Sequence, residues 1–125
     1  MISKRNLLAE FESIDEHWSP RVIGQVNDQY IKVAKGLGEL AWHKHDHEDE
    51  LFQVVRGRLR IQFENDVEVV LDEGDFVVVP RNTLHNPVAD EECWFVLIET
   101  TTTKHTGDVE TAWTRSIEDQ QRDFR

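Results

Sequence analysis

From Gln29 to Thr101 the chain is a succession of short apolar runs, and residues that favour turns separate them. The runs are 30–34, 51–55, 59–63, 67–71, 76–79 and 93–98. In the third run, Leu59, Ile61 and Phe63 alternate with polar residues, which is the period-two pattern of a half-buried strand. Short strands with a turn about every ten residues favour an antiparallel sandwich or barrel over alternating β-α-β units. We therefore predict an all-β domain of about seven strands.

The two ends of the chain have a different character. Near the start, apolar residues recur at helical spacing, at Leu7, Leu8, Phe11 and Ile14. With Asn6 as N-cap and Pro20 behind them, they predict a helix over residues 5–18. Near the other end, sparse apolar residues at Val109, Trp113, Ile117 and Phe124 allow either one C-terminal helix or a partly ordered tail. We expect three parts: an N-terminal helical extension (1–27), a β-barrel (28–103) and a C-terminal tail (104–125).

The balance of charge excludes several classes of partner. The 125 residues include 25 acidic and 14 basic ones, which gives a formal net charge of −11. Binding to nucleic acid needs clustered cations that neutralise phosphates, so this surplus of acids opposes it. No apolar stretch approaches the roughly 18 residues of a membrane span, and the first residues do not form an apolar signal core. The single cysteine, Cys93, fits a reducing compartment, so we expect a cytoplasmic protein with neither nucleic-acid nor membrane partners.

Residues that could carry chemistry are concentrated between Trp42 and Glu50, where three of the six histidines lie within five positions. Residues i and i+2 of a strand share a face, so His43 and His45 would present two imidazoles side by side. Glu50 follows a short acidic connection, and His85 comes 35 residues after it. Two neutral imidazoles with a carboxylate are a ligand set that Fe(II), Mn(II), Zn(II) and related ions prefer. A histidine-rich surface loop that binds no metal is the alternative.

Two stretches resemble the two motifs of the cupin superfamily, whose small members are double-stranded β-helix, or jelly-roll, barrels of the RmlC-like type. The first motif is Gly, His-x-His, three or four residues, Glu, six residues and Gly. Here it reads Gly38, His43-Lys44-His45, Glu50 and Gly57. The second motif is Gly, five residues, Pro-x-Gly, two residues, His, three residues and Asn. Here it reads Gly74, Pro80-Arg81-Asn82 and His85. The resemblance covers roughly residues 28–101.

Three positions depart from these motifs. The leading Gly38 is one residue closer to the histidines than is usual, and Ala89 stands in place of the final asparagine. Asn82 replaces a glycine, which is tolerable because asparagine is among the few residues that adopt positive φ. None of the three changes removes a ligand of the family's metal site. Sixteen residues separate Gly57 from Gly74, as in the compact members of the family.

The resemblance implies that His43, His45, Glu50 and His85 form a three-histidine, one-glutamate site for one divalent transition metal, Zn, Fe, Mn or Ni. Four protein ligands on a six-coordinate ion leave two positions open for a small molecule. The function implied is that of an isomerase- or dioxygenase-type enzyme acting on a small polar metabolite. The alternative is a non-catalytic small-molecule or sugar binding module with a structural or ligand-anchoring metal. A homodimer is also implied by the resemblance.

The remaining histidines lie outside the motif spacing. Only two residues separate His47 from Glu50, too few for the family motif, so we assign His47 to the rim of the site. His17 and His105 fall outside the barrel pattern, and we expect both to be solvated surface groups.

Several other side chains have a plain structural interpretation. Arg60 alternates with Arg58 on a strand face, and we expect it to pair with acids across the sheet; the alternative places Arg60 and Gln62 in the barrel mouth, holding a carboxylate or phosphate. Trp42 would lie opposite His43, in sheet packing or a dimer interface. We expect a buried, structural thiol at Cys93 and core positions for three aromatic residues, Phe52, Trp94 and Phe95.

Overall fold

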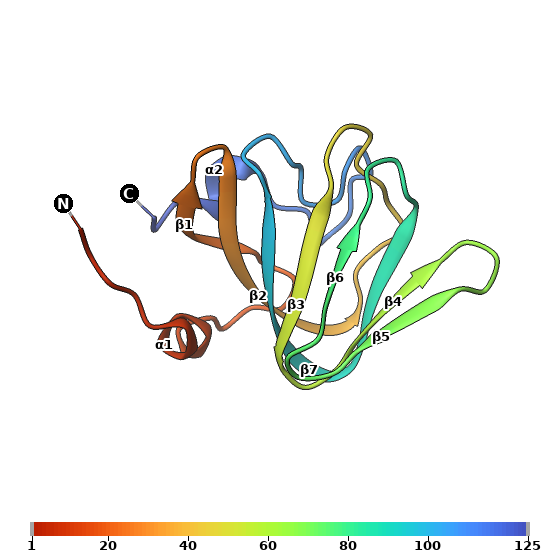
Figure 1. Ribbon diagram of the computed structural model, residues 1–125, viewed down its shortest axis with the longest axis horizontal. Coiled ribbons are helices and arrows are strands. Elements are labelled where there is room, and N and C mark those ends of the chain that lie inside the picture. Colours follow the sequence, from red (N-terminus) through yellow and green to blue (C-terminus); the bar gives the residue numbers. More distant parts are fainter. Residues whose placement is uncertain (1, 125) are drawn as a thin grey trace.

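The computed structural model describes residues 2–124, and most of its regular structure is antiparallel β-sheet (Figure 1). The elements are α1 (Leu7–Glu12), β1 (Arg21–Val26), β2 (Gln29–Glu39), β3 (Glu50–Arg56), β4 (Leu59–Phe63), β5 (Glu68–Leu71), β6 (Phe76–Val79), β7 (His85–Thr100) and α2 (Ile117–Gln120). The predicted all-β class is confirmed, and the six apolar runs named above correspond to strands β2 to β7. No helix in residues 2–124 is long and apolar enough to cross a membrane.

The long strand β7 organises the sheet. Its second half, from Cys93 onward, pairs with β2 on one side and β3 on the other, in the order β1-β2-β7-β3-β6. Its first half pairs with β4, which in turn pairs with β5. One strand therefore belongs to both walls of the rolled sheet, and the β4–β5 hairpin projects from the side opposite α1 (Figure 1). This is the jelly-roll architecture that the sequence predicts.

The core lies inside this roll and follows the period-two pattern of the strands. Leu59 and Ile61 of β4 are fully buried, whereas Arg60 and Gln62 lie on the other face and are partly exposed. Phe52 and Phe95 are buried in the same cluster, with ring centroids 6.1 Å apart. The core positions predicted for these two aromatic residues are confirmed.

A second apolar cluster covers the outer face of the sheet where α1 packs. Phe11 of α1 stacks on Trp94 of β7, with ring centroids 5.2 Å apart, and both side chains are buried. Asn6 caps the helix, since its side chain accepts a hydrogen bond from the Ala9 amide. The helix is shorter than predicted because only its Phe11 side is covered, and the chain turns at Ser13.

The structure adds a strand that the sequence did not predict, and of the two alternatives for the C-terminal segment it shows only a short helix, α2. β1 pairs with β2 although its sequence, RVIGQV, contains only a short apolar run. Residues 104–116 form turns, and only the four residues of α2 are helical. Thr106 and Thr114 hydrogen bond to each other, and threonine side chains that bond locally compete with a helix.

The outer face of β3 and β6 is not covered by α1. Phe76 and Val78 of the edge strand β6 are 65% and 48% exposed, next to partly exposed Leu51 of β3. Trp42 is also exposed, at 42%. A homodimer that would cover such residues stays a prediction.

Candidate metal centre

Backbone pairing brings the two sequence motifs together. His43 and His85 form an isolated antiparallel bridge in which each amide donates to the carbonyl oxygen of the other at 2.9 Å. The amide of Asn82 donates to the carbonyl oxygen of His45 at 2.7 Å. The loop that carries the His-x-His pair is therefore fixed to the turn before β7. The expected strand over His43 and His45 is wrong, because this loop makes only the single bridge.

Asn82 has the conformation that the glycine of the family motif would require. Its φ is +60°, so the prediction that asparagine serves there is confirmed. Lys44 donates to the Asn82 side chain at 3.0 Å, and the Arg81 amide donates to the Asp49 carboxylate at 2.8 Å. Asn82, which stands where the family motif has glycine, thus still connects the turn to the histidine loop.

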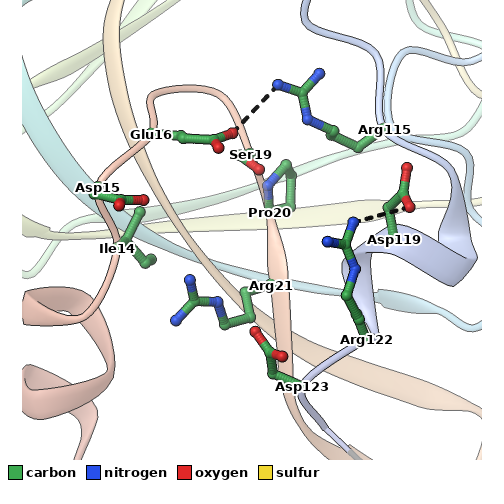
Figure 2. A pocket seen from close by; sticks show the side chains of 10 residues that line it. All are labelled: Ile14, Asp15, Glu16, Ser19, Pro20, Arg21, Arg115, Asp119, Arg122 and Asp123. Atoms are coloured by element: carbon green, nitrogen blue, oxygen red, sulfur yellow. Dashed lines mark hydrogen bonds and ion pairs between the residues drawn. The ribbon is translucent and has the colours of Figure 1, made fainter.

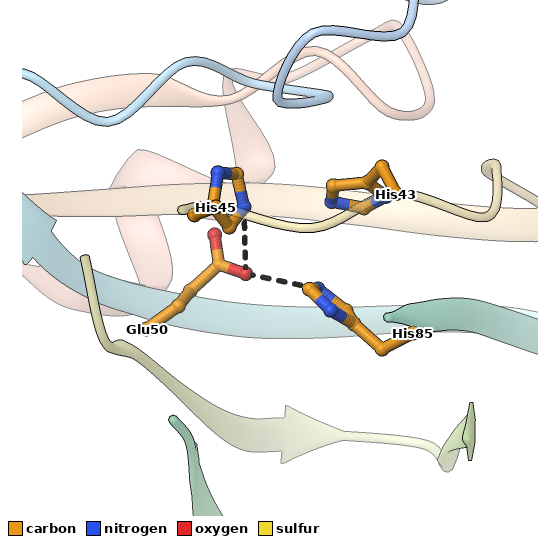
Figure 3. A group of neighbouring side chains, drawn as sticks. All are labelled: His43, His45, Glu50 and His85. Atoms are coloured by element: carbon orange, nitrogen blue, oxygen red, sulfur yellow. Dashed lines mark ion pairs between the residues drawn. The ribbon is translucent and has the colours of Figure 1, made fainter. Parts of the chain in front are cut away.

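The structure brings together the four side chains predicted as metal ligands, His43, His45, Glu50 and His85 (Figure 3). One potential ligand atom from each lies within 4.8 Å of all the others, and all four residues are buried. Glu50 Oε1 is 3.4 Å from His45 Nε2 and 3.3 Å from His85 Nε2. Glu50 opens β3 and His85 opens β7, so two strand ends and one loop converge on a single point.

Hydrogen bonds leave ring nitrogens of this cluster without partners. The Nδ1 atoms of His43 and His85 lie 2.8 Å from the carbonyl oxygens of Ala41 and Thr83. Each Nδ1 then donates, and each neutral ring keeps a lone pair on Nε2. Among the described residues no hydrogen bond forms at Nε2 of His85, at either ring nitrogen of His45, or at Oε1 of Glu50. Unpartnered buried polar atoms are costly, and a divalent cation accepts these donor types, so the residues fit a metal ion.

The protonation states of two cluster residues, His43 and Glu50, suit a cation. Burial, followed by repulsion from His85, lowers the pKa of His43 to about 4, which keeps that imidazole neutral. Burial opposes ionisation of Glu50, but the adjacent Glu99, His45 and His85 side chains outweigh it and hold the pKa of Glu50 well below its usual value. Burial and the Glu50 carboxylate raise the pKa of Glu99 well above its usual value. Of the two adjacent carboxyls, Glu50 therefore ionises first.

A buried ion pair lies behind Glu50. Lys32 Nζ of β2 is 2.8 Å from Glu99 Oε1 of β7, and the two side chains are 0% and 2% exposed. Lys32 also donates to Gln120 Oε1 of α2 at 2.6 Å. The motifs do not predict this pair; its only signal in the sequence is a lysine and a glutamate within two apolar strand runs.

The other histidines divide into two groups. His47 is exposed and outside the cluster, as expected for a rim residue. His17 is partly exposed and lies 2.7 Å from Glu92. The prediction for His105 is wrong, because it is only 8% exposed and burial lowers its pKa to about 3. It becomes buried because the segment after β7 folds back over the histidine loop.

Arg60 pairs with acidic residues on a strand face, which is the first of the two roles considered for it. Its guanidinium bonds to Asp90 at 2.9 Å and to Glu68 at 3.2 Å, on the sheet face opposite the core. The mouth-lining interpretation of Arg60 and Gln62 is therefore wrong; Gln62 instead accepts a hydrogen bond from Asn86. Cys93 is fully buried, and burial raises the pKa of its thiol to about 12, as expected for a structural cysteine.

A small cavity adjoins the cluster inside the barrel. His43, Glu50 and His105 are its ionisable lining residues, and the rest of its wall is apolar, with Phe52 and Leu97 among it. Its volume is about 20 Å³. A space of that size accommodates one water-sized molecule.

The segment after β7 closes the outer side of the histidine loop. Thr102 donates to Glu48 at 2.9 Å, and Gly107, with φ of +58°, packs directly on the backbone of Lys44. A Cβ at position 107 would overlap the Lys44 carbonyl oxygen. The loop bearing His43 and His45 is thus enclosed from both sides.

Gly107→Ala is expected to destabilise the protein by about 2–4 kcal/mol, because positive φ and the overlap with Lys44 both penalise the side chain. Urea denaturation measures this loss. Gly74→Ala is the matched control, since Gly74 also has positive φ but no atom within 4 Å of the added Cβ. It should cost only about 1 kcal/mol. Equal losses in the two variants would contradict the close packing on Lys44.

A surface hollow of about 320 Å³ lies where the N- and C-terminal segments meet (Figure 2). Three arginines and four acids line it, so it has no uniform charge that would favour one class of ion. Arg115 bonds to Glu16 at 3.4 Å across it. The Arg115–Glu16 bond has a structural role, since it connects the C-terminal segment to the chain before β1.

Comparisons with known proteins agree with this architecture. The sequence model of the cupin domain family matches residues 29–99. The uncharacterized protein YdbB of Bacillus subtilis is 36% identical over 85 residues, which are 68% of this chain and 75% of that protein.

Two solved structures are also similar. A cupin-2 domain containing protein from Shewanella frigidimarina has 40% identity and a TM-score of 0.75, over 77% of this chain and 93% of that one. A protein from Neisseria meningitidis has 30% identity and a TM-score of 0.73, over 78% and 99%. With the rolled sheet, both motifs and a family match over more than half of its length, the chain belongs to the cupin family.

Proposed function

We propose that this cupin binds one divalent transition metal and acts as a dioxygenase-type enzyme on a small polar molecule. The observation that carries the proposal is the buried cluster of three imidazoles and one ionised carboxylate whose ligand atoms lack hydrogen-bond partners. His43, His45, Glu50 and His85 would hold the ion. When bound, such an ion supplies Lewis acidity and open coordination positions.

The inner cavity has room for a small co-substrate such as dioxygen, which a dioxygenase needs and a sugar isomerase does not. Its volume of about 20 Å³ is far below that of a metabolite, and its wall is mostly apolar. It suits a molecule of one or two heavy atoms, such as water or dioxygen. Phe52 and Leu97 line that side of the cluster with apolar surface, while the ionised Glu50 supplies negative charge for the ion.

Elemental analysis combined with oxygen consumption tests this proposal. Protein purified without oxygen is expected to carry close to one equivalent of iron and to consume dioxygen with a subset of small hydroxylated or carbonyl compounds. Zinc or nickel with conversion of a sugar but no oxygen consumption would favour the isomerase instead. Compounds that bind without being converted would favour the binding module. Protein that takes up none of these metals would contradict every metal-dependent version.

A further inference from the structure

A fourth histidine reaches the inner cavity from outside the barrel strands. His105 follows β7 and lines the cavity together with His43 and Glu50. It is more than nine-tenths buried, at 8% exposure. An imidazole is thus present in an otherwise apolar wall, beside two members of the metal cluster, without belonging to the cluster itself.

A backbone hydrogen bond fixes which ring nitrogen of His105 carries the proton. The Arg115 amide donates to His105 Nδ1 at 3.0 Å. An amide can only donate, so Nδ1 holds the lone pair and the neutral ring has its hydrogen on Nε2. No residue in the described range 2–124 accepts a hydrogen bond from Nε2. The Nε2 hydrogen is therefore free to bond to a ligand in the cavity that His105 lines.

The position of this donor is fixed relative to the cluster. Two residues after His105, Gly107 packs on Lys44, which lies between His43 and His45. Farther along, Gln120 accepts a hydrogen bond from the buried Lys32. The same segment therefore holds the histidine loop and places the His105 ring.

We propose that His105 is a ligand-binding residue that donates a hydrogen bond from Nε2 to the small molecule held at the metal ion on the cavity side. The ligand class is a molecule of one or two heavy atoms with an acceptor atom, as dioxygen or water has. The inference rests on the proposed metal-dependent function, because the ion must hold the other end of that molecule. It adds a residue from the C-terminal segment that neither cupin motif contains.

Nitric oxide bound to the Fe(II)-loaded protein is a suitable diatomic probe. His105→Asn retains an oxygen that can accept from the Arg115 amide but lacks the Nε2 donor. We expect this variant to bind Fe(II) within about twofold of the wild type and nitric oxide at least about tenfold more weakly, with a higher N–O stretching frequency. His105→Gln, which places an amide donor near the Nε2 position, should recover part of the affinity. His17→Asn, outside the cavity, should change neither property.

The outcomes separate this inference from the proposed function. A wild type that takes up no Fe(II) would contradict both. Normal Fe(II) uptake with unchanged nitric oxide affinity and stretching frequency in His105→Asn would overturn only the role of His105. If His105→Asn does not fold, magnetic resonance of the wild-type nitrosyl decides. An exchangeable proton hydrogen-bonded to nitric oxide supports the inference, and its absence overturns it.

Discussion

His45→Ala is expected to lower the affinity for the divalent ion by at least about 100-fold. Loss of a residue that merely orients a ligand already costs about 10–100-fold in metal affinity, and His45 would supply a ligand atom itself. Both of its ring nitrogens are buried without hydrogen-bond partners, and Nε2 lies 3.4 Å from Glu50. Competition titration with a chromophoric chelator, using Zn²⁺ or Co²⁺, measures the change.

His47→Ala is the matched control for that experiment. His47 lies two residues farther along the same loop, but it is exposed and outside the cluster. Its removal should change the affinity by less than about twofold. If the two variants bound the ion equally well, the ion would not be held by the buried cluster.

Lys32→Met is expected to lower the free energy of unfolding by about 3–5 kcal/mol. Removal of one partner from a buried pair leaves the other polar group in the interior without its partner, which is much costlier than loss of an exposed pair. Here Glu99 would lose its partner at 2.8 Å while it lies beside the ionised Glu50, and Gln120 would lose its donor. Urea denaturation, with the slope checked for two-state behaviour, measures the loss.

Two further variants test whether the loss of stability in Lys32→Met comes from the buried pair. Replacement of both partners, Lys32→Met with Glu99→Leu, should recover more than half of the loss, because paired apolar replacements of buried ions are often close to neutral. Arg58→Met removes an exposed pair with Asp72 and should cost at most about 1 kcal/mol. A loss in Lys32→Met no larger than that in Arg58→Met would contradict a structural role for the buried pair.

The sequence predicted the parts of the fold that obey local periodicity. Leu59 and Ile61 alternate with Arg60 and Gln62, and the structure buries the first pair and not the second. β1 was missed because the strand RVIGQV becomes regular only through pairing with β2. A sequence window holds no information on such a partner.

The four cluster residues could be predicted because their spacing in the sequence matches the two family motifs. The surroundings of the cluster could not be predicted in the same way. His105 is a lone histidine in a polar segment, and only the return of that segment over Lys44 buries it. Lys32 and Glu99 lie 67 positions apart, and their pairing depends on the register of β2 against β7. Contacts of this kind are set by topology rather than by local pattern.

The most direct test of the central claim is anomalous X-ray diffraction, at the absorption edge of the metal, from crystals of the metal-loaded protein. We expect one strong peak bounded by His43, His45, Glu50 and His85, with ligand distances of about 2.0–2.2 Å. No peak there after exposure to Fe²⁺, Zn²⁺, Mn²⁺ and Ni²⁺ in turn, or a peak only at exposed groups such as His47, would contradict it.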